Sequence, residues 1–271
     1  MLGAVLPHPP VLLGEIGRGH EREAQATLDA YGVVAGRLHE LEVSRLLMIS
    51  THGIVTLNRF HILAARLSGN MSRFDAPDVS FGRDIDHQLT DTVSKRAAEA
   101  DVPLTAAAQW EESDHSLGVP LRLLEDAVPD RIAVVGISFR RPEEHLRFGK
   151  AISAALSDIE EPTAVLASGD AVHTLSDASA YGHHRRADEV QQQYESALRA
   201  WDPEALCAID EDLRREVDES VISSTLILMG ALHGSDANPH ILASEHHWGV
   251  GYVTSLIEVT PSLSPPFGGR C

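Results

Sequence analysis

The sequence has little cysteine, a shortage of basic residues and no long hydrophobic run. Only two of its 271 residues are cysteine, Cys207 and Cys271, too few for a disulfide framework or a thiolate metal site. Lysine and arginine number 22 against 40 acidic residues, and the net charge of -18 would repel nucleic acid and an anionic membrane surface. No stretch approaches the roughly 18 apolar residues of a membrane helix. We therefore expect neither nucleic acid nor a membrane as partner.

The N-terminus also lacks the features of an export signal. Residues 1–6 carry no basic segment, and their short apolar run is followed at once by Pro7-His8-Pro9-Pro10. This pattern predicts a first strand in a cytoplasmic protein. Internal repeats, low-complexity segments and Pro-, Gly- or Ser-rich linkers are also missing, so we expect one domain over residues 1–271.

Buried apolar runs alternate with stretches of helical spacing along most of the chain. The runs predict strands, and the helical spacing predicts helices between them. We expect strands at 2–6, 45–50, 102–108, 132–138, 163–167 and 250–259, and helices at 21–41, 84–100, 119–127, 143–158 and over most of 188–232. Residues 58–81 predict only short strands that line a mouth or an edge, and the stretch before residue 250 is rich in turn formers. Strand–helix–strand order implies an α/β fold with a mostly parallel central sheet flanked by helices.

Fifteen histidines stand out against this ordinary composition. His8, His52 and His173 each lie just past the C-terminal end of a predicted strand. In open α/β sheets the loops at that edge converge on one crevice, where ligands bind. A single histidine is more often a surface residue or a hydrogen-bonded core residue, but a pair at matching strand ends favours a shared site. His8 and His52 are therefore candidate metal ligands.

Two histidines leave a metal site incomplete. Non-haem Fe(II) enzymes add one carboxylate and keep positions open for substrate and dioxygen. Glu245, in the segment Ala243-Ser-Glu-His-His-Trp248, is the candidate for that place. An exposed loop glutamate is the ordinary interpretation, and position in the sequence does not decide between the two.

Five segments together resemble the type III extradiol ring-cleavage dioxygenases, the group of the protocatechuate meta-cleaving catalytic subunit. They occur in the order of that family and extend from residue 8 to residue 252. The segments are Pro7-His8-Pro9-Pro10, Ser50-Thr51-His52-Gly53, Asp114-His115-Ser-Leu-Gly-Val-Pro120, Gly169-Asp-Ala-Val-His173 and Glu245-His-His-Trp-Gly-Val-Gly-Tyr252.

The resemblance implies an Fe(II) cofactor held by His8, His52 and Glu245, in a metal cleft at the C-terminal ends of the strands. It gives His173 the role of catalytic acid and base and places His115 beside the substrate. The implied reaction opens a catechol-like or aminophenol-like ring with dioxygen, for which a proton carrier titrating near neutral pH is suited. The alternative for His115 is a helix N-terminal residue, with Asp114 or Ser116 as the cap. We expect the chain to pair with itself or with a small partner subunit.

Two other functions remain open at this point. Asp114-His-Ser-Leu and Leu67-Ser-Gly-Asn-Met-Ser-Arg-Phe74 also look like the related Memo-like proteins, which are metal- or peptide-binding proteins without established ring cleavage. Those proteins tend to carry cysteine at the third ligand position, where this chain has Glu245. A hydrolase with Zn(II) at the same ligands is the other alternative.

The remaining polar and aromatic residues near these segments have ordinary interpretations. We expect Asp170 to be a turn residue, and Trp248 and Tyr252 to pack in the core. The basic group His183, His184, Arg185 and Arg186 either anchors a substrate carboxylate or forms a solvated loop.

Overall fold

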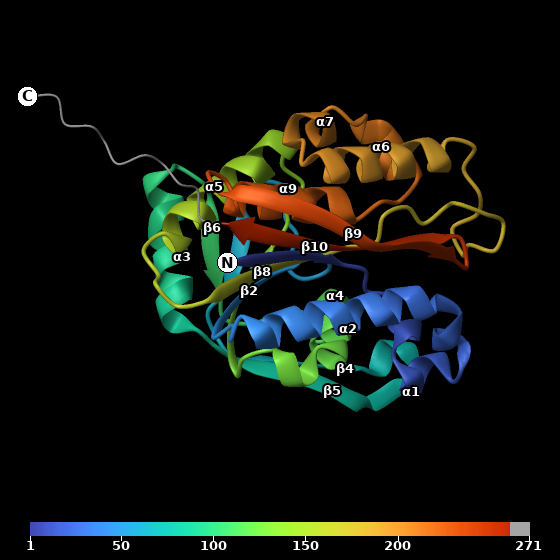
Figure 1. Cartoon of the computed structure of the whole chain (residues 1–271), viewed down its shortest axis with the longest axis horizontal. Coiled ribbons are helices and arrows are strands. Elements are labelled where there is room, and N and C mark those ends of the chain that lie inside the picture. The colour runs from blue at the N-terminus through green and yellow to red at the C-terminus, as the bar shows by residue number, and fades with distance from the viewer. Residues whose placement is uncertain (261–271) are drawn as a thin grey trace, which may run out of the picture.

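A computed structural model describes residues 1–260, and Cys271 and the last part of the predicted domain lie outside the described residues. Figure 1 shows one mixed sheet with helices on both faces. The elements in chain order are β1 (Leu2–Leu6), η1 (Pro10–Leu12), α1 (Gly14–Gly17), η2 (His20–Ala24), α2 (Gln25–Glu40), β2 (Arg45–Ser50), β3 (Phe60–Leu63), β4 (Leu67–Met71), η3 (Ser72–Phe74), β5 (Ala76–Ile85), α3 (His87–Glu99), β6 (Leu104–Ala107), α4 (His115–Leu123), η4 (Glu125–Ala127), β7 (Arg131–Gly136), α5 (Pro142–Leu156), β8 (Thr163–Ser168), α6 (Ala187–Ala200), α7 (Pro203–Cys207), α8 (Glu211–Glu216), α9 (Val221–Ala231), β9 (Asp236–His247) and β10 (Val250–Thr260).

The centre of the sheet is parallel and its margins are antiparallel. The strand order is β4-β5-β7-β2-β8-β1-β10-β9, and β3 and β6 pair beside β7. The pairs β5–β7, β7–β2, β2–β8 and β8–β1 are parallel, whereas β1–β10, β10–β9 and β4–β5 are antiparallel. The expected α/β class with a mostly parallel mixed sheet is confirmed.

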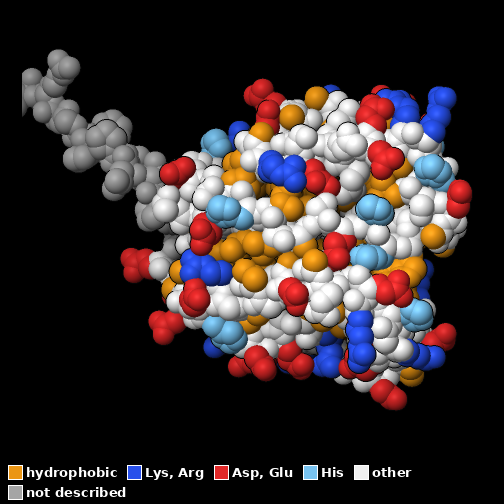
Figure 2. Space-filling view, turned by 45° about the vertical axis from the view of Figure 1, so that its right-hand side comes forward, with side chains coloured by type: hydrophobic (Ala, Val, Ile, Leu, Met, Phe, Trp, Pro, Cys, Tyr) orange, Lys and Arg blue, Asp and Glu red, His pale blue; other side chains and the backbone are white. Residues whose placement is uncertain are grey.

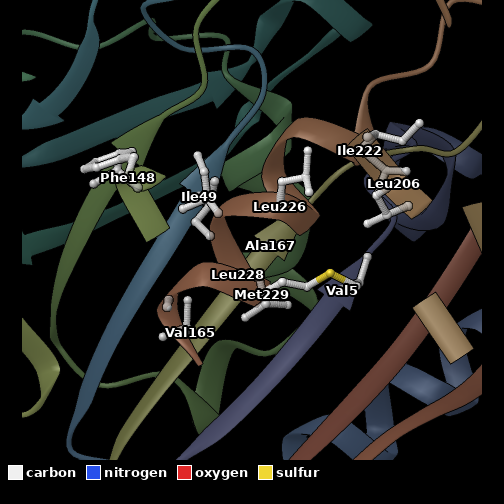
Figure 3. Close-up of a cluster of buried hydrophobic side chains, with 14 of the residues drawn as sticks. Val5, Ile49, Phe148, Val165, Ala167, Leu206, Ile222, Leu226, Leu228 and Met229 are labelled. Carbon is white, nitrogen blue, oxygen red and sulfur yellow. The ribbon is translucent and has the colours of Figure 1, made fainter. Parts of the chain in front are cut away.

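The central strands are apolar on both sides because helices cover both faces of the sheet. Val5 faces one hydrophobic cluster, together with α5 and α9, whereas Ala4 and Leu6 face another, with α2 and α4. Figure 3 shows side chains of β1, β2 and β8 meeting Leu226 and Met229 of α9. Gly149 and Gly230 let α5 and α9 approach closely, since a Cβ at Gly149 would lie 2.2 Å from the Ile227 carbonyl oxygen.

Two predictions from the pattern differ from the structure. The helix predicted at 119–127 begins at His115 rather than near Val119, because Pro120 lies inside it and masks the helical pattern. The segment before residue 250 is no turn-rich loop but the strand β9, which forms a long hairpin with β10. It is an edge strand with polar residues at both ends, including four in succession at 244–247, so it lacks the continuous apolar run by which the central strands are recognised.

Candidate metal centre

His8 is held in the structure by β1 and by the segment after β8. The side chain is fully buried, and its Nδ1 lies 2.8 Å from Ser168 Oγ. The His8 backbone N–H donates to Asp170 Oδ1 at 2.8 Å. Because Nδ1 is occupied by the serine, Nε2 is the ring atom that points outward from β1. The strand end and its parallel neighbour together fix the orientation of this imidazole.

His52 follows β2, two strands away from β1, and its Nε2 lies 3.0 Å from His8 Nε2. Two imidazole nitrogens at this separation share either a proton or a cation. Two ligands about 2.1 Å from one ion, at right angles to each other, are also about 3.0 Å apart. The loop that carries His52 is tied back to β2, since the backbone N–H groups of His52 and Gly53 donate to Ser50 Oγ.

His115 is the third imidazole at this place and comes from the first residue of α4. Its ring stacks on His52 with centroids 4.3 Å apart and meets His8 edge to face at 5.1 Å. One ring nitrogen from each of His8, His52 and His115 lies within 4.8 Å of the others. We call these three residues the histidine triad. The fold thus brings together three nitrogen donors from residues that lie far apart in the sequence.

The histidine triad is electrically neutral at neutral pH. Burial lowers the pKa of His8 well below its ordinary value and lowers the pKa of His115 to about 4. Desolvation by neighbouring groups also lowers the pKa of His52, although this residue is exposed to solvent. A neutral imidazole keeps the lone pair that a metal requires. The donor set therefore fits a divalent ion such as Fe(II) or Zn(II).

The structure does not bring Glu245 to the histidine triad. Glu245 lies on β9, and β10 separates β9 from β1, so it is two strand spacings, about 10 Å, from the strand that leads to His8. Its Oε2 accepts hydrogen bonds from both the backbone N–H and the hydroxyl of Thr27, each at 2.7 Å. Ala24, at the N-terminus of α2, has no side chain to cap that helix. Glu245 therefore supplies a cap from the sheet, where its charge also suits the helix dipole.

Asp170 and His173 stand beside the triad as a second pair. Asp170 is buried, and its Oδ2 lies 3.7 Å from both His8 Nε2 and His173 Nε2. His173 Nδ1 donates to the carbonyl oxygen of Asp218. Burial opposes the charged form of His173, but the charge of Asp170 outweighs it and raises the pKa of His173. Nδ1 is bonded to the carbonyl oxygen of Asp218, so Nε2 is the ring atom of His173 that is left to take up or release a proton.

The expectation that Asp170 is a turn residue is therefore incomplete, because its carboxylate also lies beside two histidines. Burial would raise the pKa of Asp170, but the adjoining His8 and His173 outweigh it and hold it below the usual value. The carboxylate is thus ionised next to the triad. A signal was present in the sequence, since Asp170 precedes His173 by three residues at a strand end, but that spacing is equally common in plain turns.

Aromatic side chains flank the two groups. The Phe74 ring meets His115 edge to face at 5.0 Å, and the exposed Tyr181 ring meets His173 at 5.4 Å. Tyr252 is buried in the core, as expected, and Trp248 packs partly buried against the same hydrophobic cluster.

The basic group of residues 183–186 is largely matched with acidic side chains. His183 lies 4.0 Å from Asp177, His184 lies 3.3 Å from Glu216, and Arg186 binds Glu189 at 2.8 Å. Figure 2, which brings this end of the molecule toward the viewer, shows acidic, basic and histidine side chains interspersed over the face. The arrangement is that of a solvated, internally paired loop.

The α/β sheet thus carries at its carboxyl edge three imidazoles that could hold a metal ion. A model of the family described as "Catalytic LigB subunit of aromatic ring-opening dioxygenase" matches residues 2–255. The chain belongs to this family, as the five segments of the sequence predict.

Two further comparisons matched most of the chain. "Protein CA_C1420" of Clostridium acetobutylicum is 26% identical over 266 residues, which cover 94% of this chain and 56% of that protein. The chain therefore spans about half the length of this relative. The crystal structure of the uncharacterized protein JW3007 from Escherichia coli K12 has the same fold, with a TM-score of 0.66 at 15% identity over 95% of this chain and 100% of that chain. In residues 1–260 no helix is long and apolar enough to cross a membrane.

Proposed function

We propose that this protein is a non-haem Fe(II)-dependent dioxygenase that opens the ring of a catechol-like or aminophenol-like substrate with dioxygen. The observation that carries the proposal is the histidine triad at the carboxyl edge of the sheet, beside an acid–base pair, in a chain of the ring-opening dioxygenase family. When bound, the metal supplies a centre that holds the substrate oxygens near dioxygen and lets electrons pass between them.

His8 and His52 are the first two proposed ligands, and the geometry favours His115 as the third. The alternative third ligand is Glu245, which would have to leave Thr27 to reach the triad. A comparison of His115→Ala with Glu245→Ala decides between them. We expect His115→Ala to lose Fe(II) when the protein is prepared without air and desalted, and Glu245→Ala to retain it. The opposite result would restore Glu245 as the ligand.

The proposed role of His173 is to hold and move the proton that ring opening requires. Asp170 stabilises the protonated ring and Asp218 fixes its orientation, so Nε2 can give up a proton and take it back. The flanking Phe74 and Tyr181 rings offer apolar surface to an aromatic substrate. His173→Ala should retain Fe(II) and lose turnover.

Oxygen uptake is the direct test of the activity. The protein, reconstituted with Fe(II), is mixed with a panel of catechols and aminophenols while oxygen and the visible absorption of ring-fission products are recorded. We expect uptake matched by product for at least one compound and none for His8→Ala. An absence of uptake with every compound contradicts the proposal and favours a metal-binding protein without ring cleavage.

A Zn(II) hydrolase is the second candidate, because three histidines without a carboxylate also suit Zn(II). Metal analysis of protein purified without air separates the two. Predominant iron supports the dioxygenase, whereas zinc with no gain of activity on exchange for Fe(II) supports the hydrolase.

The proposal includes association with a second copy or with a small partner subunit. Leu57 and Phe139 support it, since these large apolar side chains are 79% and 70% exposed on the loops that follow β2 and β7. Light scattering coupled to size-exclusion chromatography measures the assembly, and a monomer at all concentrations would contradict self-association.

A further inference from the structure

Asp114 occupies the N-cap position of α4 but does not cap the helix. Three other aspartates at N-caps use their carboxylates in the ordinary way and accept backbone N–H groups of the first turn. These are Asp86 at α3, Asp202 at α7 and Asp210 at α8. The Asp114 side chain makes no such bond. Since an N-cap contributes about 1 kcal/mol, its carboxylate must be engaged elsewhere to compensate.

The carboxylate of Asp114 instead binds three neutral donors from the surrounding loops. Ser50 Oγ donates to Oδ2 at 2.5 Å, and Trp110 Nε1 donates to the same oxygen at 2.7 Å. Ser116 Oγ donates to Oδ1 at 2.6 Å. The donors come from the end of β2, from the loop after β6 and from the first turn of α4. Asp114 thus joins three segments.

Ser50 and Ser116 extend the hydrogen-bond network of Asp114 to the loop that carries His52. Each hydroxyl gives its single proton to Asp114, so its oxygen is left to accept. Ser50 Oγ accepts the backbone N–H groups of His52 and Gly53, and Ser116 Oγ accepts that of Thr51 at 3.1 Å. Three consecutive N–H groups around His52 are therefore held by hydroxyls that Asp114 orients. The same aspartate immediately precedes His115.

The indole ring of Trp110 packs against the loop that carries His52. A Cβ at Gly53 would lie 2.3 Å from the indole ring, so the tryptophan fits only because residue 53 has no side chain. The indole also lies over Gly136 at the end of β7. The loop of His52 is thus packed on one side and hydrogen-bonded on the other.

The charge of Asp114 has no cationic partner among residues 1–260. The side chain is fully buried, and no lysine, arginine or histidine in that part of the chain forms an ion pair with it. A buried carboxylate with only neutral donors is costly unless a positive charge lies near. The triad is the nearby place at which a cation is expected.

We propose that Asp114 is a positioning residue for the metal centre, which sets His52 against His115 and supplies the buried negative charge that a divalent ion balances. The inference rests on the proposed metal site and concerns a residue outside the ligand set. Residues that orient metal ligands in this way typically change metal affinity by about 10- to 100-fold when they are altered.

The test compares Asp114→Asn with Asp86→Asn in the full chain. Both replace a buried N-cap aspartate, but Asp86 lies at the opposite edge of the sheet, where it pairs with Arg45. The apoproteins are titrated with Co(II), and the visible spectrum of the bound ion and urea unfolding of the apoprotein are recorded. We expect Asp114→Asn to raise the Kd for Co(II) at least about tenfold and to shift the spectrum. Asp86→Asn should lower stability with both metal readouts unchanged.

Equal Kd values for the two variants would overturn the inference while leaving the metal site in place. If the parent itself fails to bind Co(II), or if His8→Ala binds it equally well, the proposed metal site and this inference both fail. Should Asp114→Asn not fold, Trp110→Phe removes one donor and keeps the carboxylate. It should raise the Kd about threefold, and an unchanged Kd would overturn the positioning role.

Discussion

Charged and ionisable side chains lie both where the parallel strands of the central sheet begin, here called the amino edge, and where they end, the carboxyl edge. The two groups differ in how their charges are partnered. At the amino edge, Arg45 binds Asp86 at 2.7 Å and Glu161 at 2.8 Å, and its side chain is 13% exposed. At the carboxyl edge, three neutral imidazoles face one another beside the buried carboxylates of Asp114 and Asp170. Each charge of the first group has a partner of opposite sign within the group. The second holds negative charge and nitrogen lone pairs that a divalent cation would satisfy.

Unpaired donors and charges indicate a candidate binding site better than the volume of a cavity does. A cavity of about 630 Å³ opens at the amino edge and is lined by Arg45, Asp86 and Glu161. A larger one, about 850 Å³, lies between α6 and α7, away from any histidine of the site. Side chains that already satisfy one another have nothing left for a ligand. The unbalanced donors at the carboxyl edge are the better mark of a site.

The largest expected effect is on metal binding at the carboxyl edge. His8→Ala removes a donor that Ser168 and β1 hold in place, so the Kd for Co(II) should rise at least about 100-fold. Arg45→Met at the amino edge should leave the Kd unchanged. Isothermal titration of the two apoproteins measures both values, and a comparable change in the two variants would remove the distinction between the edges.

The next largest effect is on the pH dependence of stability, and it distinguishes the histidine triad from His145, a buried histidine with a structural role. His145 is fully buried, with Nδ1 donating to the Arg141 carbonyl oxygen and Nε2 accepting the Ser138 N–H, and burial lowers its pKa to about 4. Above pH 6.5 both folded and unfolded chains hold it neutral. Below that pH the unfolded chain takes up the proton first, so stability falls until pH reaches about 4.

This single group accounts for on the order of 3 kcal/mol of the free energy of unfolding across that range. His145→Gln should flatten the decline, and His8→Ala should do so as well, because burial also lowers the pKa of His8. Urea unfolding of the apoproteins at pH 7, 6 and 5 gives the slopes. Loaded with metal, only the parent and His145→Gln should gain stability. A slope unaltered in His145→Gln would contradict the assignment.

A smaller effect is expected from breaking the ion pairs at the amino edge. Arg45→Met leaves Asp86 and Glu161 without their cation, and the pair is only partly exposed. We expect the free energy of unfolding to fall by about 2 kcal/mol. Chemical denaturation measures it, with Arg66→Met, whose side chain is 64% exposed, as the matched surface control. The control should fall by less than about 1 kcal/mol.

The smallest effect concerns Glu245. Glu245→Ala leaves the buried Thr27 N–H at the start of α2 without an acceptor, which should cost about 1 to 2 kcal/mol. Thr27→Val keeps that backbone bond and loses only the hydroxyl contact, so it should cost less. Thermal unfolding compares the two, and a stability equal to the parent in Glu245→Ala would rule out the capping role.

The central fold was predictable because each inner strand has a continuous apolar run at its centre. Residues 45–50 and 163–167 contain such runs, and both form parallel strands as expected. The edge strand β9 was not predictable by the same rule, since Asp236–His247 contains no long apolar run and its last four residues are polar. A segment that buries only part of its side chains does not differ locally from a loop.

The candidate site also contains residues whose placement was predictable from the sequence and residues whose placement was not. His8 and His52 are predicted as partners because both follow strands of a parallel sheet, and the structure places their Nε2 atoms 3.0 Å apart. Their proposed role as ligands stays a prediction. The nearness of His115, by contrast, depends on how α4 packs, and the distance of Glu245 depends on the insertion of β10 between β1 and β9.

Sequence by itself determined the family, the parallel core and which strand ends carry histidine, since these follow from local pattern and from the direction of strands. Tertiary structure alone decided that His115 completes the triad, that Glu245 caps α2, and that Asp114 turns from its helix to the loop of His52. The reason is physical. Strand order, helix packing and the partner chosen by a buried carboxylate are set by contacts between residues far apart in the chain, and local pattern carries no information on those distances.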